Sequence, residues 1–167
     1  MLPALQLNIS MAPATTRDTQ LGIAWIALCL ALALHITDEA LTGFLSVYNP
    51  TVMAMRERVP WFPMPVFAFG EWLAGLIVGD LLLLCLSVFA FRGLRWLRPL
   101  AYVFAVLMIL NGLGHTAGTI LGRTVASVHF ARPMPGFYSS PLLLAASIYL
   151  LFRLRAGRYA PGDAPHR

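Results

Sequence analysis

Apolar residues fill four long stretches of this chain, and shorter polar or turn-rich segments separate them. The stretches are residues 21–43, 65–91, 97–121 and 136–152. An α-helix needs roughly 20 mostly apolar residues to cross the hydrocarbon core of a bilayer, whereas barrel strands are shorter and alternate in character. Backbone groups in lipid must also be hydrogen-bonded internally. The pattern therefore predicts an all-α fold, a four-helix transmembrane bundle within residues 20–155.

The segments outside these stretches are expected to be linkers and tails. The predicted linkers are residues 46–64, 92–96 and 122–135. The first linker contains Trp61 and Phe62, and we expect it to lie at the membrane surface as a cap over a pocket. Residues 1–19 and 156–167 are polar or rich in glycine and proline, so we expect both to be flexible tails.

Composition supports a membrane protein and argues against other classes. Hydrophobic residues make up 59% of the chain and charged residues only 11%. A typical soluble domain has about 25% charged residues, so a soluble globule or a disordered chain is excluded. The net charge of +5 comes from arginine, with no lysine. These arginines flank the apolar stretches, so we expect membrane lipids and no nucleic acid as partners.

The distribution of arginine predicts the orientation in the membrane. With four crossings, one side carries both termini and eight arginines, which are Arg17, Arg92, Arg95, Arg98, Arg153, Arg155, Arg158 and Arg167. The other side carries four, which are Arg56, Arg58, Arg123 and Arg132. Because positive residues accumulate on the cytoplasmic side, we expect both termini to be cytoplasmic. The chain is then a multi-pass protein of the cell inner membrane.

Polar residues inside the predicted spans are the candidates for function, because ionisable side chains are costly in hydrocarbon and usually face a cavity. They are His35, Asp38 and Glu39 in the first stretch, Glu71 and Asp80 in the second, Asn111 and His115 in the third, and Tyr138, Ser139 and Ser140 at the start of the fourth. His35 and Glu39 are four residues apart and share a helical face, as do Asn111 and His115.

Polar residues of three predicted spans lie at a similar depth in the membrane. At a helical rise of about 1.5 Å per residue, His35, Glu71 and Asn111 lie about 10 Å below the outer boundary. We therefore expect one polar pocket in the outer half of the bilayer. Asp80 lies deeper and on another face of its helix, so we place it outside this pocket.

Three sequence features resemble the HXXEE-domain family of small integral membrane proteins. They are the segment His35-Ile36-Thr37-Asp38-Glu39, the pair Asn111 and His115, and Pro135-Gly136 before the last stretch. The similarity extends over about residues 25–155. Asp38 stands where the family motif has its first glutamate, so this carboxylate is shorter by one methylene. The resemblance implies a small membrane protein and supports a site at these residues.

Two imidazoles and a carboxylate predict a metal site. His35, Glu39 and His115 are ligand types that zinc, iron and manganese accept, and three protein ligands leave a position for water or substrate. We expect Glu39, Asp38 and His115 to be catalytic. The candidate substrate-binding residues are Asn111, Glu71, Thr116 and Tyr138. The predicted activity is hydrolysis or oxidation of a small lipophilic molecule.

Three other interpretations fit the same residues. Glu39 could act as a metal-free acid with His35 or His115 and isomerise, cyclise or hydrate a lipid-like molecule. The polar groups could instead bind a small ligand or ion or relay protons, or could transport a ligand, and alternating-access transport by so small a chain would need a homodimer. They could also only hydrogen-bond and hold the helices in register.

Overall fold

The computed structural model describes residues 15–156, and within this range the regular structure is helical apart from an isolated bridge between Arg123 and His129. The helices are α1 (Thr16–Thr42), α2 (Leu45–Arg58), α3 (Phe69–Cys85), α4 (Ser87–Phe91), α5 (Leu97–Leu121) and α6 (Ser140–Ala156). The predicted all-α fold is confirmed for these residues.

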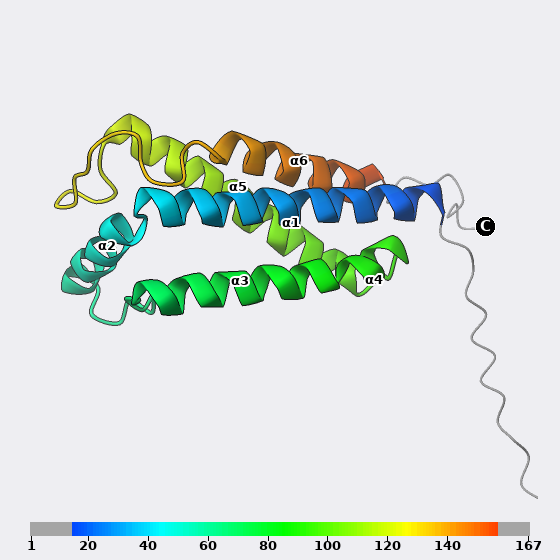
Figure 1. Ribbon diagram of the computed structural model, residues 1–167, viewed down its shortest axis with the longest axis horizontal. Helices are drawn as coiled ribbons and strands as arrows, with labels where there is room; N and C mark the ends of the chain where they lie inside the picture. Colours follow the sequence, from blue (N-terminus) through cyan, green and yellow to red (C-terminus); the bar gives the residue numbers. More distant parts are fainter. Residues whose placement is uncertain (1–14, 157–167) are drawn as a thin grey trace, which may run out of the picture.

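The long helices run up and down in alternation (Figure 1). The start of α1, the junction of α4 with α5 and the end of α6 share one end of the bundle. The opposite end carries α2 and the loop between α5 and α6. Helix α1 is central, since it packs against α6, α5, α3 and α4. This arrangement places the arginine-rich segments of the sequence together at one end.

Three helical segments are long and apolar enough to cross a membrane, namely Thr16–Thr42, Phe69–Phe91 and Leu97–Leu121. They correspond to the first three predicted spans. The fourth predicted stretch forms α6, which has 17 residues and begins at Ser140. Gly136 does not start this helix, because it adopts a left-handed conformation with φ of 83°. Residues 137–139 then form a turn before the helix begins.

Helix α1 begins earlier than the sequence predicted. The Thr15 hydroxyl accepts a hydrogen bond from the Asp18 backbone N–H at 3.3 Å, and the Thr15 N–H donates to the Asp18 carboxylate at 3.2 Å. This reciprocal cap satisfies backbone groups of the first turn. Residues 16–19 are therefore helical and not part of a flexible tail. The remaining predicted tail segments, 1–14 and 157–167, lie outside the described residues.

The first predicted linker, residues 46–64, is largely a helix, which the sequence pattern did not predict. Helix α2 buries Val47, Val52 and Ala54 against the end of the bundle, which gives it an apolar face that the sequence pattern did not reveal. Trp61 lies after this helix and is 81% exposed, so it does not cover a pocket. Phe44, immediately before α2, packs its ring against His115 of α5.

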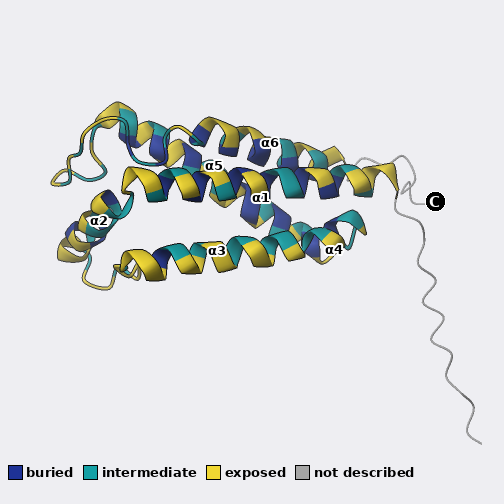
Figure 2. Ribbon diagram, viewed as in Figure 1, coloured by how far each residue is buried: buried dark blue, intermediate teal, exposed yellow. Residues whose placement is uncertain are grey.

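The core lies between α1, α5 and α6, whose buried faces turn toward one another (Figure 2). The Trp25 indole N–H also donates to the backbone carbonyl of Leu83 at 2.8 Å, which ties α1 to α3. Large apolar side chains such as Leu34 and Leu110 are more than half exposed on the outside of the bundle. An apolar exterior of this kind suits lipid rather than water as the surrounding solvent.

Candidate metal centre

Three ionisable side chains meet inside the bundle. Glu39 Oε1 lies 3.0 Å from His115 Nε2 and 3.5 Å from His35 Nε2. The exposed fractions are 0% for His35, 4% for Glu39 and 2% for His115. We call these three residues the His/Glu/His cluster. It joins α1 to α5.

Helix geometry brings the cluster together. His35 and Glu39 are one turn apart on α1, so their side chains project on the same face. His115 comes from α5, and its ring meets the His35 ring edge to face with centroids 4.7 Å apart. Gly112 lies one turn before His115, and a Cβ there would come within 2.7 Å of the Leu144 side chain. The glycine therefore lets α6 approach α5 beside the cluster.

Gly136 closes one side of the cluster with its backbone. A Cβ at this position would lie 2.8 Å from Cε1 of His115 and 2.9 Å from Cγ of Glu39. Its φ of 83° also falls in the region that side chains disfavour. The Gly136 N–H donates to the Thr42 hydroxyl at 3.2 Å, which ties the loop to the end of α1. Space and backbone conformation thus both require glycine here.

A hydrogen-bond relay orients His35 from behind. The Ser139 hydroxyl lies 2.8 Å from Asp38 Oδ2 and 2.8 Å from Nδ1 of His35, and the Ser139 N–H also donates to Asp38 Oδ2 at 2.9 Å. If the hydroxyl proton goes to the carboxylate, Nδ1 of His35 carries a proton and donates to Ser139. The neutral ring then presents the lone pair of Nε2 to the cluster.

This lone pair faces an oxygen that also accepts hydrogen bonds. His35 Nε2 is buried and has no hydrogen-bond partner among the described residues, and Glu39 Oε1 lies opposite it. Two buried acceptors that face each other are unfavourable unless a proton or a cation lies between them. A bound cation satisfies both, and it also neutralises the carboxylate in a surrounding that disfavours charge.

His115 is enclosed by an aromatic ring and by backbone. The Phe44 ring centroid is 5.6 Å from that of His115, and Phe44 also contacts Trp72 of α3. The second ring nitrogen of His115, Nδ1, is buried without a hydrogen-bond partner in the described part of the chain. The ring is therefore held by packing on one side and by Glu39 on the other.

The spacing of the donor atoms fits a metal ion. One ligand atom from each residue can be chosen so that all three lie within 4.8 Å of one another. Ligands bound at about 2.1 Å to a tetrahedral ion are about 3.4 Å apart, which is close to the separations around Glu39 Oε1. Two imidazoles and one carboxylate are ligands for zinc, iron or manganese. Three protein ligands leave a fourth position open, as catalytic sites do.

A groove leads along α5 to His115. It has a volume of about 340 Å³, and its lining residues include Leu110, Asn111, His115, Leu121 and Arg123. Apolar side chains form most of its wall, with the Asn111 amide as a polar group one helical turn from His115. The groove thus has an amide and one residue of the cluster on the same wall.

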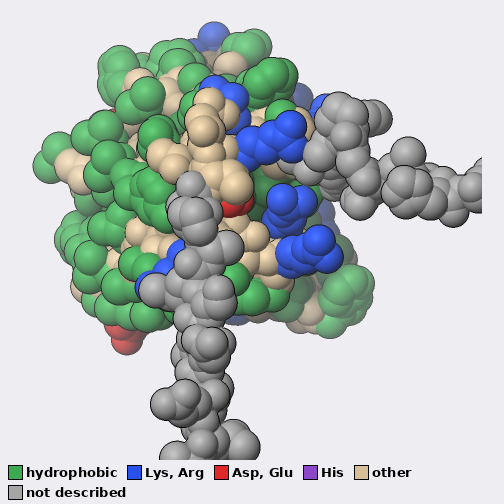
Figure 3. Space-filling view, turned by 90° about the vertical axis from the view of Figure 1, so that its right-hand side faces the viewer, with side chains coloured by type: hydrophobic (Ala, Val, Ile, Leu, Met, Phe, Trp, Pro, Cys, Tyr) green, Lys and Arg blue, Asp and Glu red, His purple; other side chains and the backbone are tan. Residues whose placement is uncertain are grey.

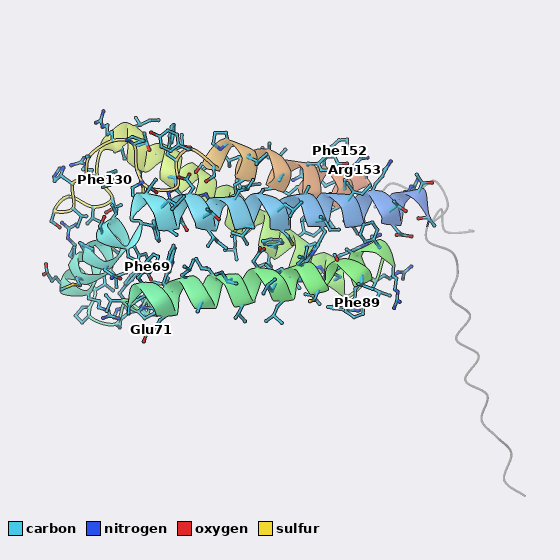
Figure 4. The ribbon with its side chains drawn as sticks, viewed as in Figure 1. Phe69, Glu71, Phe89, Phe130, Phe152 and Arg153 are labelled. Atoms are coloured by element: carbon cyan, nitrogen blue, oxygen red, sulfur yellow. The ribbon has the colours of Figure 1, made fainter. Side chains whose placement is uncertain are left out.

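The other predicted substrate-binding residues do not join the cluster. Glu71 is exposed at the start of α3, where its carboxylate accepts a hydrogen bond from the Ala68 N–H at 3.4 Å, and it points away from the bundle in Figure 4. Thr116 donates to the backbone carbonyl of Gly112 at 2.9 Å. Tyr138 is 69% exposed. The depth argument failed for Glu71 because it fixes the level of a residue but not the direction of its side chain.

Two residues of the site were not singled out by the sequence. Ser139 follows Tyr138 and was only one of several polar residues at the start of the last stretch, yet it is the one that touches His35 and Asp38. Phe44 gave no signal in the sequence, because an aromatic residue after a predicted span is common.

Asp80 lies apart from the cluster, in a separate pocket between α1 and α3.

Comparisons with protein-family models, with curated proteins and with solved structures found no match to this chain. The resemblance to the HXXEE-domain family therefore stays a prediction. What is established for the described residues is a helical chain with three membrane-length helices and a buried His/Glu/His cluster whose donor atoms fit a metal ion.

Proposed function

We propose that this protein crosses the cell membrane four times and is a metal-dependent enzyme for a small lipophilic substrate. His35, Glu39 and His115 bind a divalent ion of zinc, iron or manganese. Both termini lie in the cytoplasm, and the cluster lies in the outer half of the bilayer. The fourth crossing is α6, whose 17 residues span about 26 Å and end with Arg153 and Arg155 at the membrane surface.

The single observation that carries this proposal is the Nε2 atom of His35, which is buried without a hydrogen-bond partner among the described residues and lies 3.5 Å from Glu39 Oε1. A cluster built only for helix packing would pair each acceptor with a donor. Here Nδ1 of His35 lies 2.8 Å from the Ser139 hydroxyl, which donates a hydrogen bond to Asp38. Metal-binding histidines are commonly oriented in this way through their second nitrogen.

The residues divide the chemistry between them. A bound metal ion would polarise a carbonyl or activate a water molecule. Asp38 and Ser139 hold the His35 ring in one tautomer, and Gly136 and Phe44 keep water away from two sides of the cluster. Asn111 lies on the groove, where its amide can orient the polar group of a substrate. The apolar wall of the groove favours a lipophilic molecule.

Elemental analysis of the detergent-purified protein tests the proposal. We expect about one transition-metal ion per chain, and loss of most of it in His35→Ala and His115→Ala. His129→Ala is the matched control, because His129 is an exposed loop histidine that is not part of the cluster. Wild-type protein without metal, after purification and after incubation with zinc, iron(II) or manganese, would overturn the proposal.

A metal-free acid–base enzyme is the second candidate. The observation that favours it is the direct contact of Glu39 Oε1 with His115 Nε2 at 3.0 Å, which is ordinary hydrogen-bond distance. A proton shared between these groups would be available for isomerisation or hydration. This candidate predicts no metal in wild-type protein and a normal fold in Glu39→Gln. Metal in the wild type that Glu39→Gln lacks would decide against it.

A further inference from the structure

A second polar site lies at the other end of the bundle. Arg17 of α1, Arg98 of α5 and Arg153 of α6 line one pocket with a volume of about 710 Å³. Figure 3 shows this end of the molecule, where arginine side chains gather around a single acidic group. Along α1, the pocket is about 28 Å from Glu39, so it is separate from the His/Glu/His cluster.

The pocket carries excess positive charge. Asp18 is the only acidic residue among those that line it, and its carboxylate accepts hydrogen bonds from the Thr15 N–H and hydroxyl at 3.2 and 2.7 Å. The other oxygen of Asp18 faces Gly93, where an added Cβ would collide with it. Within residues 15–156 no carboxylate forms an ion pair with an arginine. Three arginines thus line a pocket whose one carboxylate is already hydrogen-bonded to Thr15.

Arg153 is the most firmly placed of the three. One of its terminal nitrogens donates to the Gln20 side-chain oxygen at 3.0 Å, and its guanidinium lies 5.0 Å from the centre of the Tyr149 ring. Its Nε is buried and has no hydrogen-bond partner among the described residues. Packing and one hydrogen bond therefore hold this guanidinium in place. A positioned guanidinium is a bidentate partner for an oxyanion.

Two of the three pocket arginines are less exposed than their neighbours, whereas Arg17 is exposed. Arg98 and Arg153 are half-buried, whereas Arg92, Arg95 and Arg155 at the same end are exposed. Arginines that serve only to fix orientation in the membrane need water or headgroups around them and no common pocket. The half-buried pair, on two different helices, converges instead with Arg17 on one space.

We propose that this pocket binds a phosphate group. Three arginines that surround one space match a tetrahedral oxyanion with several acceptor oxygens and more than one negative charge. The first turn of α1 adds the positive end of a helix dipole at the same place. The phosphate belongs to a phospholipid headgroup or to a soluble phosphorylated ligand, which share this chemistry.

Thermal unfolding of the purified full-length protein in detergent distinguishes these sources. The probes are phosphatidylglycerol, with diacylglycerol as the lipid without phosphate, and inorganic phosphate, with potassium chloride at matched ionic strength. A ligand that binds only the folded state raises the melting temperature with its concentration, which gives an apparent affinity. Stabilisation by phosphatidylglycerol alone identifies a lipid headgroup. Stabilisation by inorganic phosphate identifies a soluble phosphorylated ligand.

Matched variants separate the pocket from general surface charge. We expect Arg98→Gln to weaken the apparent affinity by about tenfold, the loss typical of one charge-assisted hydrogen bond. Arg155→Gln removes the same charge from an exposed position on the same end and should leave the affinity within about twofold. Arg153→Gln should weaken the apparent affinity as much as Arg98→Gln does. If Arg153→Gln does not fold, Arg98→Gln alone is compared with Arg155→Gln.

Two results would overturn the proposal. In the first, neither phosphatidylglycerol nor inorganic phosphate stabilises the wild type beyond its control. In the second, Arg155→Gln loses as much affinity as Arg98→Gln, which would show that only the summed charge of this end matters. Both results are independent of whether the His/Glu/His cluster holds a metal.

Discussion

Asp38 and His35 face opposite sides of one serine hydroxyl, with Ser139 Oγ at 2.8 Å from Asp38 Oδ2 and 2.8 Å from His35 Nδ1. The carboxylate thus acts on the imidazole through Ser139 and not by direct contact. Two residues three positions apart on α1 are linked through the turn before α6. The orientation of His35 therefore depends on how the last helix is attached to the first.

The first prediction concerns this relay. Ser139→Ala removes the hydroxyl and leaves the backbone N–H bond to Asp38 in place. We expect metal affinity to fall by about 10- to 100-fold, as it does when a group that orients a metal-binding histidine is lost. A competition titration with a chelator of known affinity measures this. Tyr138→Phe changes the exposed neighbour and should have no effect. Equal affinities for Ser139→Ala and wild type would show that the relay does not orient a ligand.

The second prediction concerns Gly136. Gly136→Ala places a methyl group within 2.9 Å of both Glu39 and His115 and strains a φ of 83°. We expect the unfolding free energy to fall by about 2 kcal/mol or more. Gly75→Ala is the control, because a Cβ there meets nothing within 4 Å and Gly75 lies inside α3. Gly75→Ala should leave the unfolding free energy unchanged or raise it, since alanine favours the helix more than glycine does. Denaturant titration in mixed micelles compares the two.

Much of this fold follows from the apolar pattern alone. The ends of α5 match the third predicted span, and α1 extends the first one by a single turn that its cap explains. Helix α2 was missed because it has only 14 residues and contains Pro50, so it lacks the length that identifies a span. Hydrophobic periodicity is informative for long segments, whereas short helices depend on the neighbour that covers them.

The site was predictable only where helix periodicity fixed side-chain direction. His35 and Glu39 are one turn apart on α1 and therefore share a face. For them to contact His115, α5 only had to pack against that face at the level of His115. Glu71 lies at a helix end, where the direction of the side chain depends on the cap. The choice between Tyr138 and Ser139 depends on the turn that Gly136 starts, which no periodicity describes.

The third prediction concerns the number of crossings. Cysteines introduced at the exposed positions of Arg95, Ala126 and Arg155 are labelled with a membrane-impermeant maleimide in a Cys85→Ser background. We expect Arg95→Cys and Arg155→Cys to react from the cytoplasmic side only, and Ala126→Cys from the outside only. Labelling of Arg155→Cys from the same side as Ala126→Cys would mean that α6 does not cross.

The fourth prediction concerns removal of the metal. A ligand present at 100 times its dissociation constant stabilises a folded protein by about 2.7 kcal/mol. Chelation should therefore lower the melting temperature of wild-type protein, and readdition of the metal should restore it. Glu39→Gln should show no such response, whereas Asp80→Asn, the control for a carboxyl group of the bundle outside the cluster, should respond as the wild type does. A chelator effect of the same size in Glu39→Gln would place the metal elsewhere.

X-ray absorption spectroscopy of the metal-loaded protein tests the central claim most directly. We expect nitrogen and oxygen ligands at about 2.0 to 2.2 Å, together with the outer scattering of two imidazole rings. In His115→Ala, reloaded with an excess of metal, that outer scattering should fall to one ring. A wild-type spectrum without imidazole scattering, or with sulfur from Cys29 or Cys85 as a ligand, would contradict a metal site at His35, Glu39 and His115.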